Sequence, residues 1–172
     1  AVSLTLFGAG LLVRAQVDGP VTATLRVGGD TQALANGEDV VLQGLSPVAR
    51  VDVKDAPLVF VGYGVSAPER HWDDHKGLDL AGKAAVVLVN DPDFELDGPG
   101  DFDGRGMTYY GRWTYKYEEL ARQGATGVLI VHETAPAAYG WATVRASGLS
   151  PVLDIPRDDA TTYHTLLRGW MQ

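Results

Sequence analysis

The sequence predicts an α/β domain with a substantial β-rich part, and three observations support this. Residues Ala84–Val89 form a continuous apolar run, typical of a strand covered on both faces. Further along, Trp113, Tyr117 and Leu120 recur at helical spacing and define one apolar helix face. Val128–Val131 is a second buried strand. The order strand, helix, strand predicts a parallel pair of strands joined by a crossover helix.

The first fifty residues are predicted to be all-β. Short β-branched segments at 21–27 and 39–42 are separated by turn-forming residues around Gly29 and Gly37. The apolar start, residues 1–13, is too short to span a bilayer and has no basic residue ahead of it, unlike a signal segment. Alternation of apolar with small or polar residues there favours an opening strand.

The remaining elements complete the expected order. Leu58–Val61 is a further short strand. Thr114 is placed to cap the N-terminus of the central helix, and Gly124 to end it in a left-handed conformation. A strand is expected near Val152–Ile155, followed by a C-terminal helix over Asp158–Leu167, where the pattern is amphipathic.

Composition limits the classes of function. A chain of 172 residues with 45% hydrophobic residues suits a single domain, taken as residues 1–172, with a core of its own. The absence of cysteine excludes disulfides and thiolate chemistry. A net charge of -8 without a basic stripe argues against nucleic acid or an anionic membrane surface as a partner.

The clearest functional signal is a long loop at one edge of the predicted sheet. More than twenty residues rich in Asp, Gly and Pro separate Val89 from Thr114, and loops of this length inside a domain are functional or disordered. Ligands and partners gather at the carboxyl ends of strands, and aromatic and Arg side chains are enriched at interfaces. We assign Trp113 and Tyr117 to packing. The predicted contact residues are Asn90, Asp91, Tyr109, Tyr110, Arg112, His132 and Glu133.

The same loop poses the question of a cation site. Its carboxylates over residues 91–106 are Asp91, Asp93, Asp97, Asp101 and Asp103. Calcium loops place their oxygens at fixed spacing, with a closing glutamate. Pro99 and the glycines break that spacing, so a solvated turn is favoured, and calcium binding remains the weaker alternative.

No catalytic or metal-ligating residue is assigned. His71 and His75 are four residues apart, but flanking Pro and Gly residues favour a turn over a helical zinc site. His132 and Glu133 are adjacent on an extended chain and point in opposite directions, so they cannot easily serve one proton. The Gly62–Gly64 segment lacks the third glycine of a nucleotide loop and is interpreted as a turn with positive φ.

Three segments resemble the protease-associated domain of bacterial bi-zinc aminopeptidases, in the clan of glutamate carboxypeptidase and the transferrin receptor. They are PLVFVGYGVSAPE (57–69), KGLDLAGKAAVVLVNDPDFE (76–95) and MTYYGRWTYKYEELARQGATGVLIVHETAPAAYGW (107–141). The similarity covers residues 57–157, preceded by a β-rich lead-in over 1–50. Its most specific parts are GLDLAGKAAVVLV and EELARQGATGVLIV.

The resemblance implies a non-catalytic accessory domain. In that family zinc is bound by a separate catalytic domain of the same polypeptide, and the accessory domain shapes substrate access or mediates contacts. The expected partners are therefore that peptidase domain and a peptide substrate, in the periplasm or outside the cell. Positions near 109–113 would lie toward the substrate, although the acidic loop 91–106 departs from the family. A free-standing peptide-binding or sorting module is the alternative.

Overall fold

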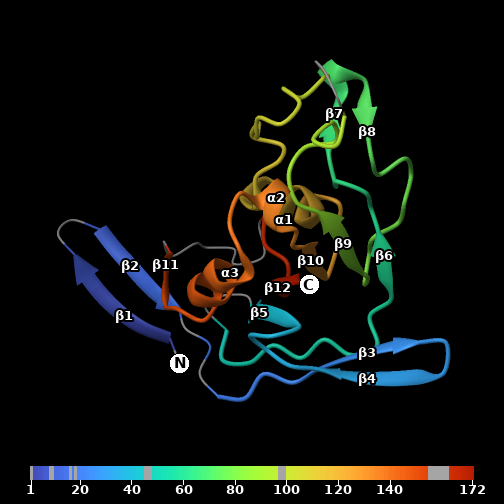
Figure 1. The fold of residues 1–172 in the computed structure, drawn as a ribbon. Helices are drawn as coiled ribbons and strands as arrows, with labels where there is room; N and C mark the ends of the chain where they lie inside the picture. Colours follow the sequence, from blue (N-terminus) through green and yellow to red (C-terminus); the bar gives the residue numbers. More distant parts are fainter. Residues whose placement is uncertain are drawn as a thin grey trace.

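The computed structural model describes residues 2–7, 10–15, 17, 19–44, 48–96, 100–154 and 163–172. It confirms a strand-rich α/β fold. The central five-stranded sheet has the order β5 (Val40–Gly44), β12 (Leu167–Met171), β10 (Gly127–Val131), β9 (Ala84–Leu88) and β6 (Leu58–Phe60) (Figure 1). Strands β6, β9, β10 and β12 run parallel, whereas β5 pairs with β12 antiparallel.

The smaller sheets come largely from the predicted β-rich lead-in. The described strands there are β1 (Val2–Phe7), β2 (Gly10–Ala15), β3 (Ala23–Val27) and β4 (Asp30–Leu34). Strands β1 and β2 form an antiparallel sheet with β11 (Val152–Asp154), and β3 and β4 form a hairpin. The opening strand and the strands expected at 21–27 and 39–42 are thus confirmed as β1, β3 and β5.

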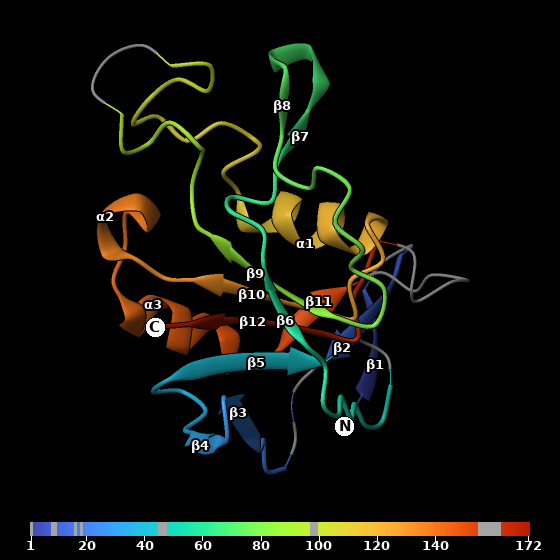
Figure 2. The ribbon, with the colours of Figure 1, turned by 90° about the vertical axis from the view of Figure 1, so that its right-hand side faces the viewer.

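The predicted strand–helix–strand unit is also confirmed. Strands β9 and β10 pair in parallel, and α1 (Trp113–Arg122) connects them and covers one face of the sheet (Figure 2). Val87, Leu120 and Ile130 are fully buried between helix and sheet. On the opposite face Val86 and Leu129 pack in a second cluster that includes Ala23 and Leu34 of the β3–β4 hairpin. The two strands are therefore covered on both faces, which explains their continuous apolar runs.

The ends of α1 differ in part from expectation. Arg112, not Thr114, occupies the N-cap, and no side chain caps the helix there. The helix therefore begins one residue before the predicted cap. At the other end Gln123 is the C-cap and Gly124 follows with a φ of 84°, as predicted for a glycine that ends a helix.

The C-terminal part of the chain contains a helix, as predicted, but the end of the predicted range differs. Two helices, α2 (Thr134–Ala137) and α3 (Trp141–Gly148), precede β11, so α3 is the last helix of the chain among the described residues. The helix predicted over 158–167 lies outside the described residues up to 162, and the described residues 163–166 are not helical. Leu167 then begins β12. Pairing with β10 and β5 satisfies the backbone of β12 on both sides, so Leu167 belongs to a strand and does not end a helix.

Short elements on the α1 side of the sheet complete the surroundings of the site. Strands β7 (Ser66–Ala67) and β8 (Trp72–Asp73) form a small hairpin around the 3-10 turn η1 (Pro68–Arg70). Figure 2 shows this hairpin beside the loop that leads into α1. The turn predicted between Pro68 and Gly77 is therefore present.

Candidate functional site at the carboxyl edge

The carboxyl ends of β6, β9 and β10 meet at one edge of the sheet, here called the carboxyl edge. Tyr63 follows β6, Asn90 follows β9, and His132 follows β10. The Leu88 amide donates to the Gly62 carbonyl (2.8 Å), which joins the first two ends. The Asn90 side chain then donates to the Pro136 carbonyl in α2 (2.7 Å), which joins the second to the third. The three strand ends are thus held together by hydrogen bonds.

Asn90 is suited to this position because its φ is 72°, in the left-handed region that asparagine tolerates. We predict that Asn90→Ala lowers the free energy of unfolding by about 2 kcal/mol, because it removes two buried hydrogen bonds, to the Pro136 carbonyl and from the Asp91 amide, and adds backbone strain. Asn90→Gly keeps the backbone conformation and loses only these two bonds, so a smaller loss is expected. Urea unfolding of both variants checks this, and equal losses would contradict the contribution of strain.

Lys116 is the central residue of the carboxyl edge, and it is fully buried. Its ammonium group donates to three backbone carbonyls, those of Tyr63 (2.7 Å), Asn90 (2.9 Å) and Tyr110 (3.3 Å). One side chain of α1 therefore connects the loop after β6, the loop after β9 and the segment before the helix. The sequence analysis missed Lys116. Its place on the apolar helix face, three residues after Trp113, was the available signal.

Burial opposes the charge on Lys116 and lowers its pKa to about 7, although the Asp91 and Asp74 carboxylates favour the charged form. Asp91 is itself buried, which raises the pKa of its carboxyl group. The Thr108 amide (2.6 Å) and hydroxyl (2.8 Å) donate to its two oxygens and act in the opposite direction. Lys116 and Asp91 are thus buried residues of opposite charge beneath the loop. We call these two residues the base of the carboxyl edge, in the sense of a structural support.

The acidic loop is not the solvated turn that was predicted, at least at Asp91 and Asp93. Asp93 is 3% exposed, and its Oδ2 accepts the amides of Phe102 (2.7 Å) and Gly104 (3.3 Å). No room remains for a side chain at Gly100, which lies against Asp93. These buried carboxylates fold the loop back on itself. Within the described residues, which omit 97–99, no group of three His, Asp or Glu residues is placed to hold a metal ion.

Phe102 fixes the other end of the loop. It is fully buried and packs edge-to-face on Trp72 and Tyr110, with ring centroids 5.6 and 5.7 Å apart. The Arg70 guanidinium lies 5.2 Å from the centre of its ring. Tyr110 is further held by a hydrogen bond from its hydroxyl to Glu69 (2.6 Å). The segment just before α1 is therefore attached to the β7–β8 hairpin.

Four residues just before and at the start of α1 form a largely exposed rim, defined as Tyr109, Tyr110, Arg112 and Trp113. Tyr109 is 56% exposed and Trp113 46%, and Arg112 is exposed as well. The packing role predicted for Trp113 holds in part, because its ring contacts the Tyr117 ring edge-on, with centroids 6.0 Å apart, but stays partly exposed, whereas Tyr117 is buried as expected. Tyr110 is half-buried. The rim combines the side-chain types that are enriched at protein interfaces.

The other predicted contact residues support the rim from below or lie beside it. Asn90, Asp91 and His132 are buried, so they do not offer a surface to a partner. The His132 ring pairs with the Tyr139 carbonyl (2.9 Å), whereas Glu133 is exposed at the N-cap of α2. The two side chains diverge, as expected for neighbours on an extended chain, and they do not share a proton.

The motif around His71 has a structural role. His71 is exposed with a φ of 55° and ends the η1 turn. Asp74 accepts the Val65 amide (3.0 Å) and the Trp72 indole N–H (3.0 Å), so its carboxylate holds the hairpin together. The Gly62–Gly64 segment contains two positive φ angles, 61° and 64°, and is the predicted turn.

Comparison of the chain with protein-family profiles, with curated proteins and with solved structures finds no match. No helix among the described residues is both long and apolar enough to cross a membrane. The geometry of the carboxyl edge, with its buried base and exposed rim, is therefore the main structural observation that bears on function.

Proposed function

We propose that the chain is a non-catalytic accessory domain of the protease-associated type, acting beside a zinc-dependent aminopeptidase domain of the same polypeptide. In this proposal the rim contacts that domain or the peptide substrate and restricts or positions the peptide. Zinc and the water that it polarises would belong to the neighbouring domain. The chain would act in the periplasm or outside the cell.

The observation that carries the proposal is the contrast between the rim and its base. Tyr109 and Trp113 expose large apolar rings to water, whereas Lys116 and Asp91 beneath them are fully buried. A rigid support under exposed aromatic side chains is the arrangement of a contact site, because little side-chain freedom is lost on binding. The segments that resemble protease-associated domains include the rim and α1, which agrees with this assignment.

A direct test of the non-catalytic role uses the chain alone. Incubated with zinc and an aminoacyl-nitroanilide, it is expected to give no turnover above the buffer. Turnover comparable to that of a whole aminopeptidase would overturn the proposal. The coding sequence on either side separates it from the alternative, a free-standing binding or sorting module. A peptidase domain supports the proposal, and a membrane span supports the alternative.

The rim predicts a dependence on peptide length. In the polypeptide that contains both domains, Tyr109→Ala with Trp113→Ala should lower kcat/KM for a long peptide about tenfold, a loss typical of a contact worth about 1.4 kcal/mol. Hydrolysis of a short aminoacyl-nitroanilide should not change, since it is too short to reach the rim. Phe60→Ala, which removes an equally exposed ring from β6, is the control. An equal loss on both substrates would contradict a guiding role.

A further inference from the structure

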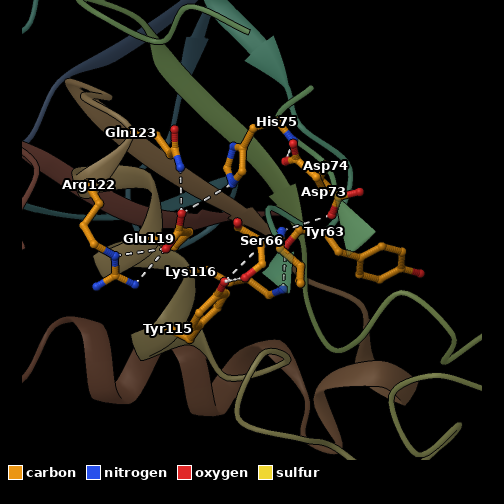
Figure 3. Close-up of polar contacts among 11 residues, drawn as sticks. Tyr63, Ser66, Asp73, Asp74, His75, Tyr115, Lys116, Glu119, Arg122 and Gln123 are labelled. Carbon is orange, nitrogen blue, oxygen red and sulfur yellow. Dashed lines mark hydrogen bonds and ion pairs between the residues drawn. The ribbon is translucent and has the colours of Figure 1, made fainter. Parts of the chain in front are cut away.

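His75 is a buried residue whose ring takes part in no hydrogen bond. It is 5% exposed, and neither Nδ1 nor Nε2 has a hydrogen-bond partner among the described residues. It lies in the segment between β8 and β9, facing α1 (Figure 3). Leaving a buried polar atom unpaired costs about 1–3 kcal/mol, so this arrangement requires an explanation.

The nearest polar group is the Glu119 carboxylate of α1, which is also buried. Its Oε2 accepts a hydrogen bond from Arg122 Nε (3.0 Å) and forms an ion pair with Arg122 Nη2 (2.8 Å). Its Oε1 accepts one bond from the Gln123 amide (2.8 Å) and lies 3.8 Å from His75 Nε2. A carboxylate offers about four acceptor positions. Two are filled by hydrogen bonds and a third faces the Arg122 ion pair, so Oε1 can accept one more bond. Figure 3 shows Oε1 on the side of Glu119 that faces His75.

We propose that His75 and Glu119 form a latch that closes on acidification. When the imidazole takes up a proton from solvent, both ring nitrogens become donors, and Nε2–H moves onto Glu119 Oε1 in a charge-assisted hydrogen bond. Such a bond is about twice as strong as a neutral one, which favours closure across a gap of 3.8 Å. The latch joins the segment after β8 to the helix that carries the rim.

Charged groups of both signs lie near the His75 ring, on α1 and in its own segment. Arg122 on α1 opposes a second positive charge near Glu119, although Glu119 already neutralises it. Asp73 and Asp74 lie in the segment of His75 itself, and Asp73 Oδ1 accepts the His75 backbone amide (2.8 Å). The latch does not depend on the proposed peptidase partner, because all of its groups belong to the described chain.

Amide exchange of the isolated chain tests the latch. The Leu78 amide donates to the His75 carbonyl (2.7 Å) and reports the opening of this segment. After correction for intrinsic exchange, its opening equilibrium should fall about tenfold on acidification from about pH 8 to about pH 5. His75→Asn and Glu119→Gln should each abolish this fall. His71→Asn, at an exposed histidine four residues earlier, should retain it.

The remaining outcomes decide against the latch. A wild-type opening equilibrium that is constant or rises on acidification would overturn it, and so would a fall of the same size in Glu119→Gln. If His75→Asn does not fold, the comparison of wild type with Glu119→Gln is sufficient. Because the measurement uses neither zinc nor peptide, failure of the latch is distinguishable from failure of the accessory-domain proposal.

Discussion

Replacement of Lys116 by Met is expected to lower the free energy of unfolding by about 3 kcal/mol at neutral pH. The substitution keeps a similar apolar stem but leaves one buried and two partly buried carbonyls without this donor. It also leaves Asp91 without its opposite charge. Relief of the cost of burying an ammonium group offsets part of the loss. Chemical unfolding measures the change.

The control for this substitution is Lys54→Met, because the Lys54 side chain is 78% exposed and its ion pair with Asp52 lies at the surface. Its removal should change the stability by less than about 0.5 kcal/mol. If Lys116→Met also lowered the stability by less than about 0.5 kcal/mol, the three loops of the carboxyl edge would be held by other contacts.

The difference in stability between the wild type and Lys116→Met should depend on pH. The pKa of Lys116 is about 7 in the folded chain, below its ordinary value of 10.5. Between these values the unfolded chain binds the proton more tightly, so raising the pH favours the folded state. The stability of the wild type relative to Lys116→Met should therefore rise from pH 7 to 10.5, by about 1 kcal/mol per pH unit, and should be constant below pH 7. A decrease in this window would contradict burial as the dominant cause.

Replacement of Phe102 by Ala should produce a similarly large loss, about 3–5 kcal/mol, because it opens a cavity among Trp72, Tyr110 and Arg70. Thermal and urea unfolding measure it. The matched control is Phe60→Ala, since the Phe60 ring is 62% exposed and its removal opens no cavity. A loss below about 1 kcal/mol in Phe102→Ala would contradict the anchoring of the acidic loop by this ring.

The regular elements could be predicted because their signals are local. The apolar runs of β9 and β10, the face of α1 and the glycine at 124 each follow from spacing within a few residues. Strand β12 could not be predicted in this way. It is a strand because it inserts between β5 and β10, and its neighbours come from positions far away in the sequence.

The carboxyl edge was predictable in position but not in detail. Strand ends and an unusually long loop indicated where it lies. Whether an acidic residue such as Asp93 is solvated or buried depends on amides from Phe102 and Gly104, which the sequence does not place. Lys116 and Trp113 show the same limit, because both lie on the apolar face of α1, yet one is buried by polar partners and the other is exposed. Periodicity identifies a helix face but not what covers it.

The most direct test of the account is amide exchange of residues 107–113, in the chain alone and in the longer polypeptide with the regions encoded on either side. If the rim is a contact surface, these amides should exchange at least about tenfold more slowly in the longer polypeptide, because the rim is then covered. Amides of the β3–β4 hairpin should be unaffected. Unchanged exchange at the rim, with protection appearing on another face of the domain, would contradict the central claim.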